Sequence, residues 1–250
     1  MRDLGTFGGT GSQAAGINES GAVAGFAWYP GDHYGRAFVW SAGAGMQDIG
    51  ALPGANHSSA YGINDACQVV GWGLDANGLP RAFLYSAGTI SELPVFEGHA
   101  TYANAINNHG QLACLYDWQA YHSFFYDPTT GVRAIGELPG HRWACAEDIN
   151  DFGQVVGYSY RFGPLNDDRA FLWQDGTIVD LNELIPADSG WILRQARGIN
   201  NRGQIVGTGL ISGQWHAYVA TPVPEPTTLV LLSAGLAGLA FLRTRRWGQP

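Results

Sequence analysis

The chain has 250 residues, enough for one medium-sized domain or a repeat array, and its apolar share of 46% argues against wholesale disorder. Its net charge is −8, all 13 basic residues are arginine, and the segment up to Thr221 carries 10 arginines against 20 acidic residues. This excess of negative charge excludes the basic stripe that nucleic-acid binding needs. The 36 glycines indicate many tight turns between short strands.

The dipeptide Ile-Asn marks an internal repeat, with spacings of 46, 43, 43 and 50 residues. Periods of about 40–50 residues are typical of propeller blades and helical solenoids. No unit contains a long apolar run of helical period, and glycine interrupts each unit at the roughly 8–12-residue spacing of short strands. The repeat therefore predicts β structure. The dipeptide starts at Ile17, Ile63, Ile106, Ile149 and Ile199.

Each unit is predicted to hold four strands. The first ends in Ile-Asn, as in residues 60–64, and an Asn-x-x-Gly turn follows, in which asparagine caps the backbone and glycine takes a positive φ. Cys67 replaces this glycine in the second unit, so we expect a strained or differently built turn there. The second strand is a Gln-Val-Val-Gly run such as 154–157, the third an Ala-Phe-Leu-Trp run such as 170–173, and the fourth a segment such as 177–181.

One four-stranded unit cannot bury both of its faces, so five units are expected to stack around an axis as an all-β, five-bladed propeller. Residues 1–9 match the fourth-strand segment 47–50, while the fifth unit supplies only three strands. The N-terminal strand is therefore predicted to complete the fifth blade and close the ring. A missing upstream blade is the alternative. The predicted propeller spans 1–221, with units at about 14–52, 60–94, 103–138, 146–185 and 196–220 plus 1–9.

The repeat motifs resemble the bacterial HAF-repeat proteins, which are named for a His-Ala-Phe run. His216 keeps the histidine of that run, whereas Arg36, Arg81 and Arg169 replace it in other units. The strings "DLGTFGG" and Gly-Ile-Asn-x-x-Gly-Gln-Val-Val-Gly add to the likeness, which covers about residues 3–220. The resemblance implies an extracellular protein and carries little biochemistry.

The C-terminal segment 222–250 departs from the repeat. Pro224, Glu225 and Pro226 precede an apolar run over 227–242, and an arginine cluster follows. As a helix this run would reach about 24 Å, slightly less than a hydrocarbon core of about 30 Å. A buried core segment is the alternative, but the position outside the repeat and the basic end disfavour it. The arginines, which would hold that end in the cytoplasm, are Arg243, Arg245 and Arg246.

This three-part segment resembles a PEP-CTERM sorting signal. The resemblance implies that an exosortase-type membrane protease cuts near the Pro-Glu-Pro element and that the protein reaches the cell surface or matrix. The apolar helix would then be only a transient anchor in the inner membrane. Residues 1–4 begin directly in repeat sequence rather than in a secretion signal, so we expect the true start to lie upstream.

The expected ligand face carries the loops after each second strand and before each first strand. These loops vary between units and are rich in aromatic residues, and variable loops on a rigid scaffold commonly carry function. Aromatic rings beside polar groups suit sugar rings, so we expect non-catalytic polysaccharide binding or a scaffold role, with no cofactor. The alternative is that the rings only cover the blade tops. The candidates are Trp28, Tyr29, His33, Tyr34, His57, His99, Trp118, Tyr121, His141, Trp143, Tyr160, Trp191 and Trp215.

Two other kinds of site are disfavoured. A metal held by the three loop histidines His57, His99 and His141 would need one common register, and these residues lie at different distances from their Ile-Asn dipeptides. The cysteines, an odd number without a Cys-x-x-Cys pair, are expected to give one buried thiol and at most one fortuitous disulfide bridge rather than a functional site. They are Cys67, Cys114 and Cys145.

A glycan hydrolase is the alternative function. It would need two carboxylates about 5–9.5 Å apart across the bond. Among the first strands only Glu147 and Asp148 are acidic, both in one unit, and strand alternation would point one of them away from the channel. No Gly-x-Ser-x-Gly elbow or phosphate loop occurs either. A hydrolase would therefore use loop carboxylates such as Asp32, Asp117, Asp167 or Asp168.

Overall fold

The computed structural model describes residues 1–94, 98–116, 122–161 and 167–223. Within these ranges the chain is all-β apart from one 3₁₀ turn, η1 (Leu181–Glu183). The helix expected over 227–242 lies outside the described residues. No helix in the described ranges is long and apolar enough to cross a membrane.

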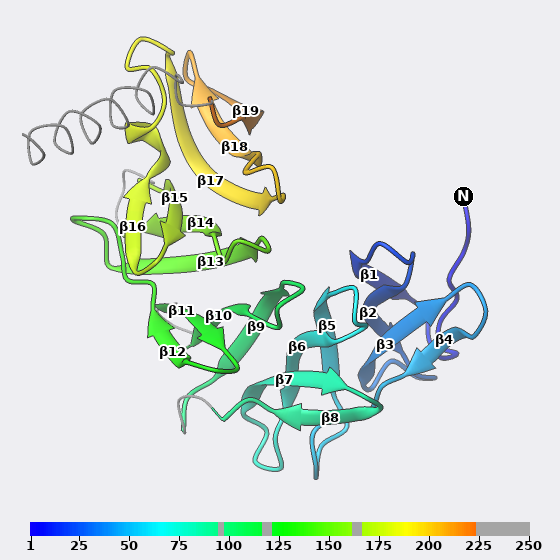
Figure 1. Ribbon diagram of the computed structural model, residues 1–250. Helices are drawn as coiled ribbons and strands as arrows, with labels where there is room; N and C mark the ends of the chain where they lie inside the picture. The colour runs from blue at the N-terminus through cyan, green and yellow to red at the C-terminus, as the bar shows by residue number, and fades with distance from the viewer. Residues whose placement is uncertain (95–97, 117–121, 162–166, 224–250) are drawn as a thin grey trace, which may run out of the picture. The chain divides into compact units, whose positions relative to one another are not determined.

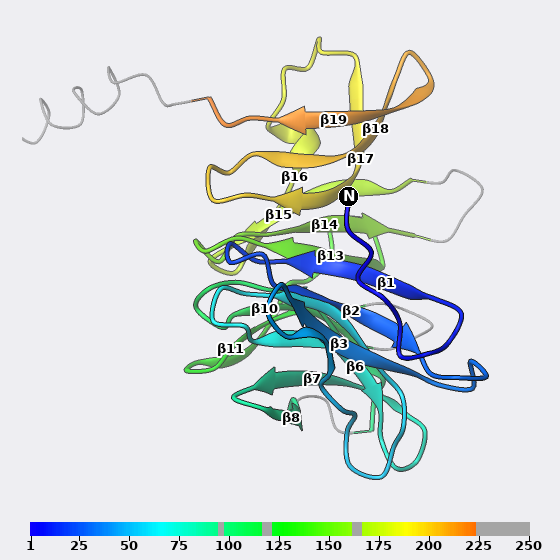
Figure 2. The ribbon, with the colours of Figure 1, turned by 90° about the vertical axis from the view of Figure 1, so that its right-hand side faces the viewer.

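Five antiparallel sheets follow one another in chain order, which confirms the five repeat units (Figures 1 and 2). In each sheet the strands pair in sequence order. The first sheet holds β1 (Ser12–Ile17), β2 (Val23–Trp28), β3 (Gly35–Ser41) and β4 (Gly45–Asp48), and the second β5 (Ser58–Ile63), β6 (Val69–Leu74), β7 (Pro80–Ser86) and β8 (Thr89–Glu92). The third holds β9 (Thr101–Ile106), β10 (Leu112–Tyr116), β11 (His122–Asp127) and β12 (Gly131–Ala134), and the fourth β13 (Trp143–Ile149), β14 (Val155–Tyr160), β15 (Arg169–Gln174) and β16 (Thr177–Asp180). The fifth holds β17 (Trp191–Ile199), β18 (Ile205–Ile211) and β19 (Gln214–Ala220).

Each sheet packs its face on the next. The first strands β1, β5, β9, β13 and β17 contact one another in turn, so they form the inner wall of the array. Apolar clusters fill the space between consecutive sheets, as where Ala24 of the first sheet meets Ile63 and Phe83 of the second. The repeated apolar tetrapeptide is the third strand, and its phenylalanine is fully buried, as at Phe38 and Phe171. One sheet alone would expose these faces, which is why the units stack.

Every inner strand carries a β-bulge, and this bulge explains the glycine that ends each Gln-Val-Val-Gly run. In the second sheet the pairing of β5 with β6 skips Tyr61. A Cβ built on Gly71 would lie only 2.0 Å from the carbonyl oxygen of Ser59, so the inner strand can approach this closely only at a glycine. Gly157 shows the same approach to Cys145. The third sheet has the buried Cys114 at the corresponding position.

The turn asparagines join the sheets to one another. The side-chain amide of Asn18 donates to the carbonyl oxygen of Asn64 at 3.0 Å, and Asn64 donates likewise to Asn107 at 3.1 Å. Asn107 donates to Asn150 at 2.9 Å, and Asn150 donates to Asn200 at 3.1 Å. We call these four contacts the asparagine ladder. The Asn-x-x-Gly turns are therefore also the joints between sheets.

Cys67 confirms the expected strain in the second turn. Its backbone N–H still donates to the Asn64 carbonyl oxygen at 3.0 Å, so the turn has the same hydrogen bond as the others. Its φ is 56°, a left-handed conformation that costs a residue with a Cβ about 1–2 kcal/mol.

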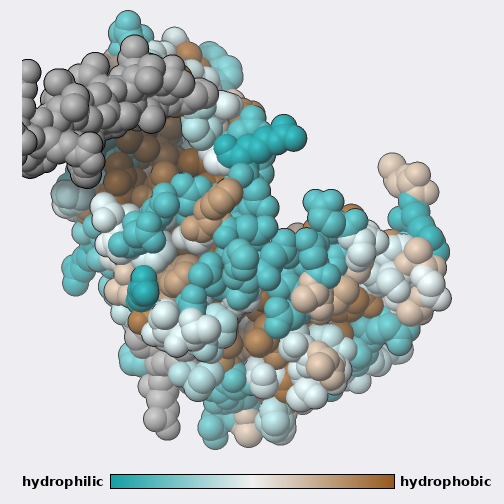
Figure 3. Space-filling model, viewed as in Figure 1, coloured by the Kyte–Doolittle hydropathy of each residue, from teal (hydrophilic) through white to brown (hydrophobic). Residues whose placement is uncertain are grey.

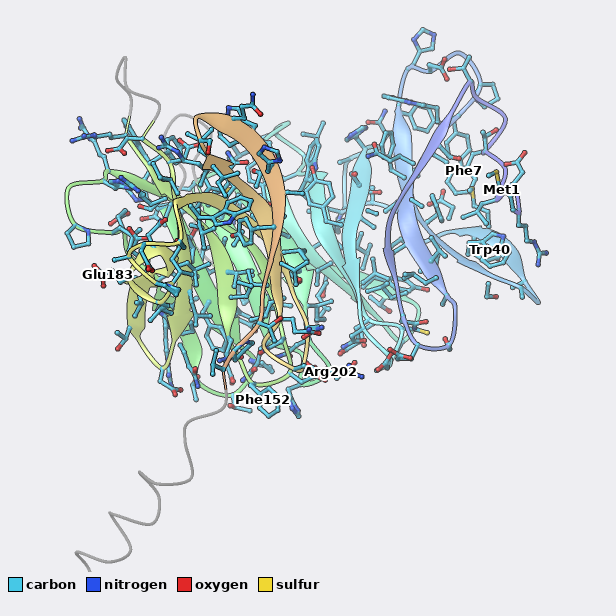
Figure 4. The ribbon with its side chains drawn as sticks, turned by 90° about the horizontal axis from the view of Figure 1, so that it is seen from above. Met1, Phe7, Trp40, Phe152, Glu183 and Arg202 are labelled. Carbon is cyan, nitrogen blue, oxygen red and sulfur yellow. The ribbon has the colours of Figure 1, made fainter. Side chains whose placement is uncertain are left out.

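The N-terminal segment does not close the ring as expected. Residues 1–10 contain no strand, and within the described residues the fifth sheet has three strands. The segment covers the outer face of the first sheet instead: Leu4 and Phe7 pack on the cluster that includes Trp40, and the guanidinium of Arg2 lies 4.7 Å from the Trp40 ring (Figure 4).

Candidate functional site

A cleft of about 330 Å³ opens between the first and second sheets. Its wall is mostly aromatic, with a few polar groups, which is the usual composition of a small-molecule site. Two of the predicted ligand residues, Trp28 and His57, lie in it. The lining residues are Gln13, Ala15, Phe26, Trp28, His57, Ser59, Ala60, Tyr61 and Trp72. We refer to it as the aromatic cleft.

The repeat architecture explains how the cleft forms. Phe26 follows the glycine of β2, where alternation directs its side chain toward the second sheet. Trp72 follows the glycine of β6 on the face toward the third sheet, and it borders the cleft through its contacts with His57 and Tyr61. Tyr61 is the residue skipped at the bulge of β5, and bulges re-aim side chains next to functional sites. His57 directly precedes β5, so it sits at the rim. Two second strands, one bulge and one loop thus converge on a single space.

The aromatic rings continue beyond the cleft as a row. Phe26 meets Trp28 edge-on at 5.5 Å between ring centroids, and Trp28 lies 6.3 Å from His57. His57 lies 5.1 Å from Trp72, and Trp72 lies 5.8 Å from Tyr102 of the third sheet. The row therefore crosses three sheets and presents several π-faces at spacings typical of interacting aromatic rings.

Polar groups fix the orientation of two of these rings. The Trp72 Nε1–H donates to the Tyr61 hydroxyl at 2.8 Å. The backbone N–H of Gly35 donates to Nδ1 of His57 at 3.4 Å, which places the proton of the neutral ring on Nε2. Burial lowers the pKa of His57, and the charge of Arg36 lowers it further. His57 is therefore a neutral imidazole at neutral pH.

The bulge position differs in chemistry from unit to unit on an otherwise constant scaffold. Besides Tyr61, the Asn104 amide donates to the carbonyl oxygen of Ala146 at 2.7 Å, and Arg197 forms a 2.7 Å ion pair with Glu147. The inner wall thus changes from small and aromatic at the first two sheets to charged at the last two. The residues at the corresponding bulge of each inner strand are Ala15, Tyr61, Asn104, Glu147 and Arg197, and β17 has a second bulge at Arg194.

The two acidic residues of the inner strands have separate structural partners. Glu147 faces Arg197, whose guanidinium also lies 5.2 Å from the Tyr158 ring. Asp148 accepts the backbone N–H of Ile199 at 2.8 Å, a contact between the fourth and fifth sheets. Burial raises the pKa of Asp148. The two carboxylates therefore do not face one another across a common space.

The loop carboxylates also have local partners. Asp32 accepts the backbone N–H of Thr10 at 3.0 Å. Asp167 lies 2.9 Å from the Arg161 guanidinium, with two further arginines within 3.7 Å. Asp168 accepts from the Gln195 amide at 2.9 Å, and Asp117 lies outside the described residues.

Three of the other predicted ligand residues gather on the first sheet. Tyr29 and Tyr34 stack at 5.0 Å, Phe7 lies 5.1 Å from Tyr29, and the Tyr29 hydroxyl donates to Asp48 at 2.7 Å. That hydrogen bond to a carboxylate raises the pKa of Tyr29. His33 is exposed beside this stack. These rings hold the N-terminal segment and do not line the aromatic cleft.

The remaining predicted residues are spread over the third to fifth sheets. The rings of His99 and Tyr116, Trp143 and Tyr160, and Trp191 and His216 form separate pairs at 6.0, 5.6 and 6.2 Å. His141 lines a polar cleft of about 420 Å³ with Arg161, Asp167 and Arg169. Trp215 lies on β19, not in a loop. Trp118 and Tyr121 lie outside the described residues.

The described residues contain no group of three or more histidine, cysteine or acidic side chains placed to hold a metal, and the three loop histidines lie in separate surroundings. The three cysteines are free. Burial raises the pKa of Cys114 and Cys145, whereas Cys67 is exposed.

The sequence reasoning missed Phe26, Tyr61 and Trp72. Its candidates came from loops, whereas these side chains come from strands. A sequence signal did exist, since an aromatic residue follows the second-strand glycine in three units, as at Tyr158.

Comparisons with known proteins fit this geometry. Residues 222–246 match the PEP-CTERM protein-sorting motif, which indicates an exported protein that is processed by a membrane exosortase. No curated protein matches the sequence. The fold is similar to TolB from Acinetobacter baumannii (TM-score 0.57, 10% identity), covering 84% of this chain and 52% of that one.

It is also similar to a putative TolB from Agrobacterium tumefaciens (TM-score 0.55, 16% identity, 85% of this chain and 76% of that one) and to a prolyl endopeptidase (TM-score 0.56, 13% identity, 86% and 36%). This chain thus spans about half the length of the first of these proteins. At such low identity the likeness shows a propeller-like fold and nothing about activity.

Proposed function

We propose that this exported protein is a non-catalytic binding module of the five-bladed propeller type, and that the aromatic cleft takes a saccharide. The observation that carries the proposal is the convergence of Trp28, His57, Tyr61 and Trp72 on one cleft of about 330 Å³. A volume at the low end of the range for ligand pockets fits a short stretch of a sugar chain.

The chemistry of the cleft supports a sugar ligand. The faces of Trp28 and Trp72 offer flat apolar surface for the C–H side of a sugar ring. The side chains of Gln13 and Ser59, with the Nε2–H of His57, supply hydrogen-bond partners for hydroxyl groups. The ring row that continues to Tyr102 would let neighbouring sugars of a longer polymer follow the same surface.

The carboxylates support a binding role rather than hydrolysis. A glycosidase places two carboxylic groups about 5–9.5 Å apart on either side of the bond. The lining of the aromatic cleft contains no acidic residue. Glu147 and Asp148 on the inner strands are engaged by Arg197 and by the backbone of Ile199.

The C-terminal segment supports the proposed location. Export and exosortase processing follow from the sorting motif at 222–246. We extend this to the cell surface or extracellular matrix, with transient anchoring in the inner membrane through 227–242 and release near Pro224. The resemblance of the repeats to HAF-repeat proteins agrees with this placement. Exopolysaccharide of the producing cell is the proposed ligand.

Calorimetric titration of the full chain with that exopolysaccharide tests the proposal, with reducing ends assayed in the same sample. We expect saturable heat and no release of reducing sugar. Trp72→Ala should weaken binding at least tenfold, about 1.4 kcal/mol, because it removes the central ring of the cleft. Trp215→Ala, which removes an exposed ring on β19, is the matched control and should bind like the wild type. Absence of heat, or release of reducing ends, would contradict the proposal.

A further inference from the structure

The two ends of the sheet array expose side chains whose counterparts at the internal joints are buried or partly buried. On β18, Val206 is 45% exposed, whereas its counterparts Val70 and Val156 are 0% exposed. Val219, which pairs with Val206 on β19, is 66% exposed. We call Val206, Ala217 and Val219 the end face of the fifth sheet.

The opposite end shows the same pattern. Ile17 of β1 is 70% exposed, although the corresponding Ile63, Ile106 and Ile149 are all below 10%. At internal joints this isoleucine packs against the preceding sheet: Ile63 lies so close to Gly16 that a Cβ built on that glycine would be 3.3 Å from its Cγ2. Ile17 therefore marks the end face of the first sheet.

The asparagine ladder has a direction, and its two ends are complementary. Each amide donates to the next sheet's asparagine carbonyl, but in the described chain the Asn200 amide has only Gln204 of its own turn as acceptor, at 2.9 Å. At the other end the Asn18 carbonyl oxygen accepts only from Gly21 of its own turn, at 2.9 Å. The fifth sheet thus offers the donor and the first sheet the acceptor of one further rung.

Among the residues that the structure describes, no strand pairs with the outer edge of β19 in the fifth sheet. A cleft of about 310 Å³ runs along β19, with four consecutive residues of that strand in its wall. Apolar surface gathers nearby, over the segment between β16 and β17 (Figure 3). In the other four sheets a fourth strand pairs with the third at this edge. An unpaired edge of seven residues is a template for strand addition.

The N-terminal segment has the build of the fourth-strand turn that would fit there. Asp3 Oδ1 accepts the Gly5 N–H at 2.9 Å, as Asp48 Oδ1 accepts the Gly50 N–H at 2.7 Å. Residues 4–7 then pack on the first sheet as residues 49–52 pack on the second. If another sheet docked on the first sheet, residues 1–3 would therefore lie in the position of that docked sheet's fourth strand.

We propose that the end face of the fifth sheet binds the end face of the first sheet of a second copy of this chain, so that copies associate head to tail. Within one chain the two end faces do not pack on each other (Figure 1). A second copy would bury Val206 and Val219 against Ile17, add the ladder rung from Asn200 to Asn18, and lay its residues 1–3 beside β19. Such a heterologous contact leaves a free face at each end and so builds larger rings or chains.

Complementary variants of the full chain test this geometry. Ile17→Glu places a charge on the end face of the first sheet, and Val206→Glu does so on that of the fifth. Both sites are exposed in the single chain, so the variants should fold, which near-ultraviolet circular dichroism checks. Size-exclusion chromatography with light scattering measures the molar mass of the particles at increasing protein concentration. A non-ionic detergent is included to suppress association through residues 224–250.

The wild type should exceed the mass of one chain, and its mass should grow with concentration. Each variant alone should stay at the mass of one chain, since every possible contact then includes a charged face. An equimolar mixture of the two should reach twice that mass and stop, because each variant keeps one intact face. Phe152→Glu, at an exposed turn residue away from both end faces, should behave like the wild type (Figure 4). A wild type that stays at one chain, or variants that associate like the wild type, would overturn the proposal.

Discussion

The asparagine ladder can be tested by comparing Asn107, which bonds to the next sheet, with Asn200 at the last turn. The Asn107 side chain makes four hydrogen bonds: Oδ1 accepts from the N–H groups of His109 and Gln111, and Nδ2 donates to Gln111 and to the Asn150 carbonyl oxygen. Asn200 makes the same three turn contacts in an exposed setting and no contact with a further sheet. The pair therefore isolates the buried bond between sheets.

We expect Asn107→Ala to lower the free energy of unfolding by about 3 kcal/mol, because each lost bond is worth about 0.5–1.5 kcal/mol net and a buried amide left unpaired costs about 1–3 kcal/mol. Asn200→Ala should cost about 1 kcal/mol, since water replaces the lost partners of the exposed turn. Urea unfolding followed by tryptophan fluorescence, in dilute protein, measures both.

Asn107→Asp adds a second check, because it keeps the oxygen that accepts the turn N–H groups and removes the amide donor. It should be at least as destabilising as Asn107→Ala, since a carboxylate would face the Asn150 carbonyl oxygen. Equal losses for Asn107→Ala and Asn200→Ala would show that the asparagine stabilises only its own turn and would refute the ladder.

Three further outcomes follow from single positions. Gly71→Ala should lower the free energy of unfolding in urea by more than about 2 kcal/mol, because its Cβ would meet a carbonyl oxygen at 2.0 Å. Gly78→Ala, with nothing within 4 Å and a φ of 81°, should lower it by about 1 kcal/mol. Equal losses would argue against the close approach at Gly71. Cys67→Gly should stabilise the chain by about 1 kcal/mol because it relieves a φ of 56°, and a lower thermal midpoint would contradict this. The pKa of His57 is lowered in the folded state, so the stability from its neutral ring is complete above the unfolded pKa of about 6.5 and is lost as pH falls through the folded value. The thermal midpoint should therefore fall less steeply from about pH 7 to about pH 5 in His57→Gln than in the wild type, and parallel slopes would contradict the assignment.

The strand order and the number of sheets could be predicted from sequence because both depend on local signals. Glycine and asparagine specify the turns, and alternation specifies the strands. The repeat marked by Ile-Asn was therefore sufficient to predict the number of sheets and the order of strands within each sheet. Even the strain at Cys67 follows from the residue type that its turn requires.

The contacts that a segment makes with distant parts of the chain could not be predicted in the same way. Residues 1–9 carry the pattern of a fourth strand and its turn, but the pattern does not show that residues 1–3 form no strand within one chain while Phe7 packs on the first sheet. The position directly before the apolar run of the third strand shows the same limit. Arg81 pairs with Glu92 of β8 at 2.5 Å and so joins two strands of the second sheet, whereas His122 pairs at 2.8 Å with Glu137, in the segment that follows β12.

The candidate site depended on a feature that strict alternation hides. A bulge shifts the side-chain direction by one residue, so Tyr61 faces the cleft although regular pleating would not mark it. The loop aromatics were visible in the sequence because they are exposed and variable, yet of these only Trp28 and His57 line the aromatic cleft.

The most direct test of the account is a panel of purified oligosaccharides probed with the full chain, with Trp72→Ala and Trp215→Ala measured beside it. The account predicts that the wild type binds a class of saccharides, that Trp72→Ala loses this binding, and that Trp215→Ala keeps it. Binding that survives Trp72→Ala unchanged, or no binding to any saccharide, would contradict the assignment of the aromatic cleft.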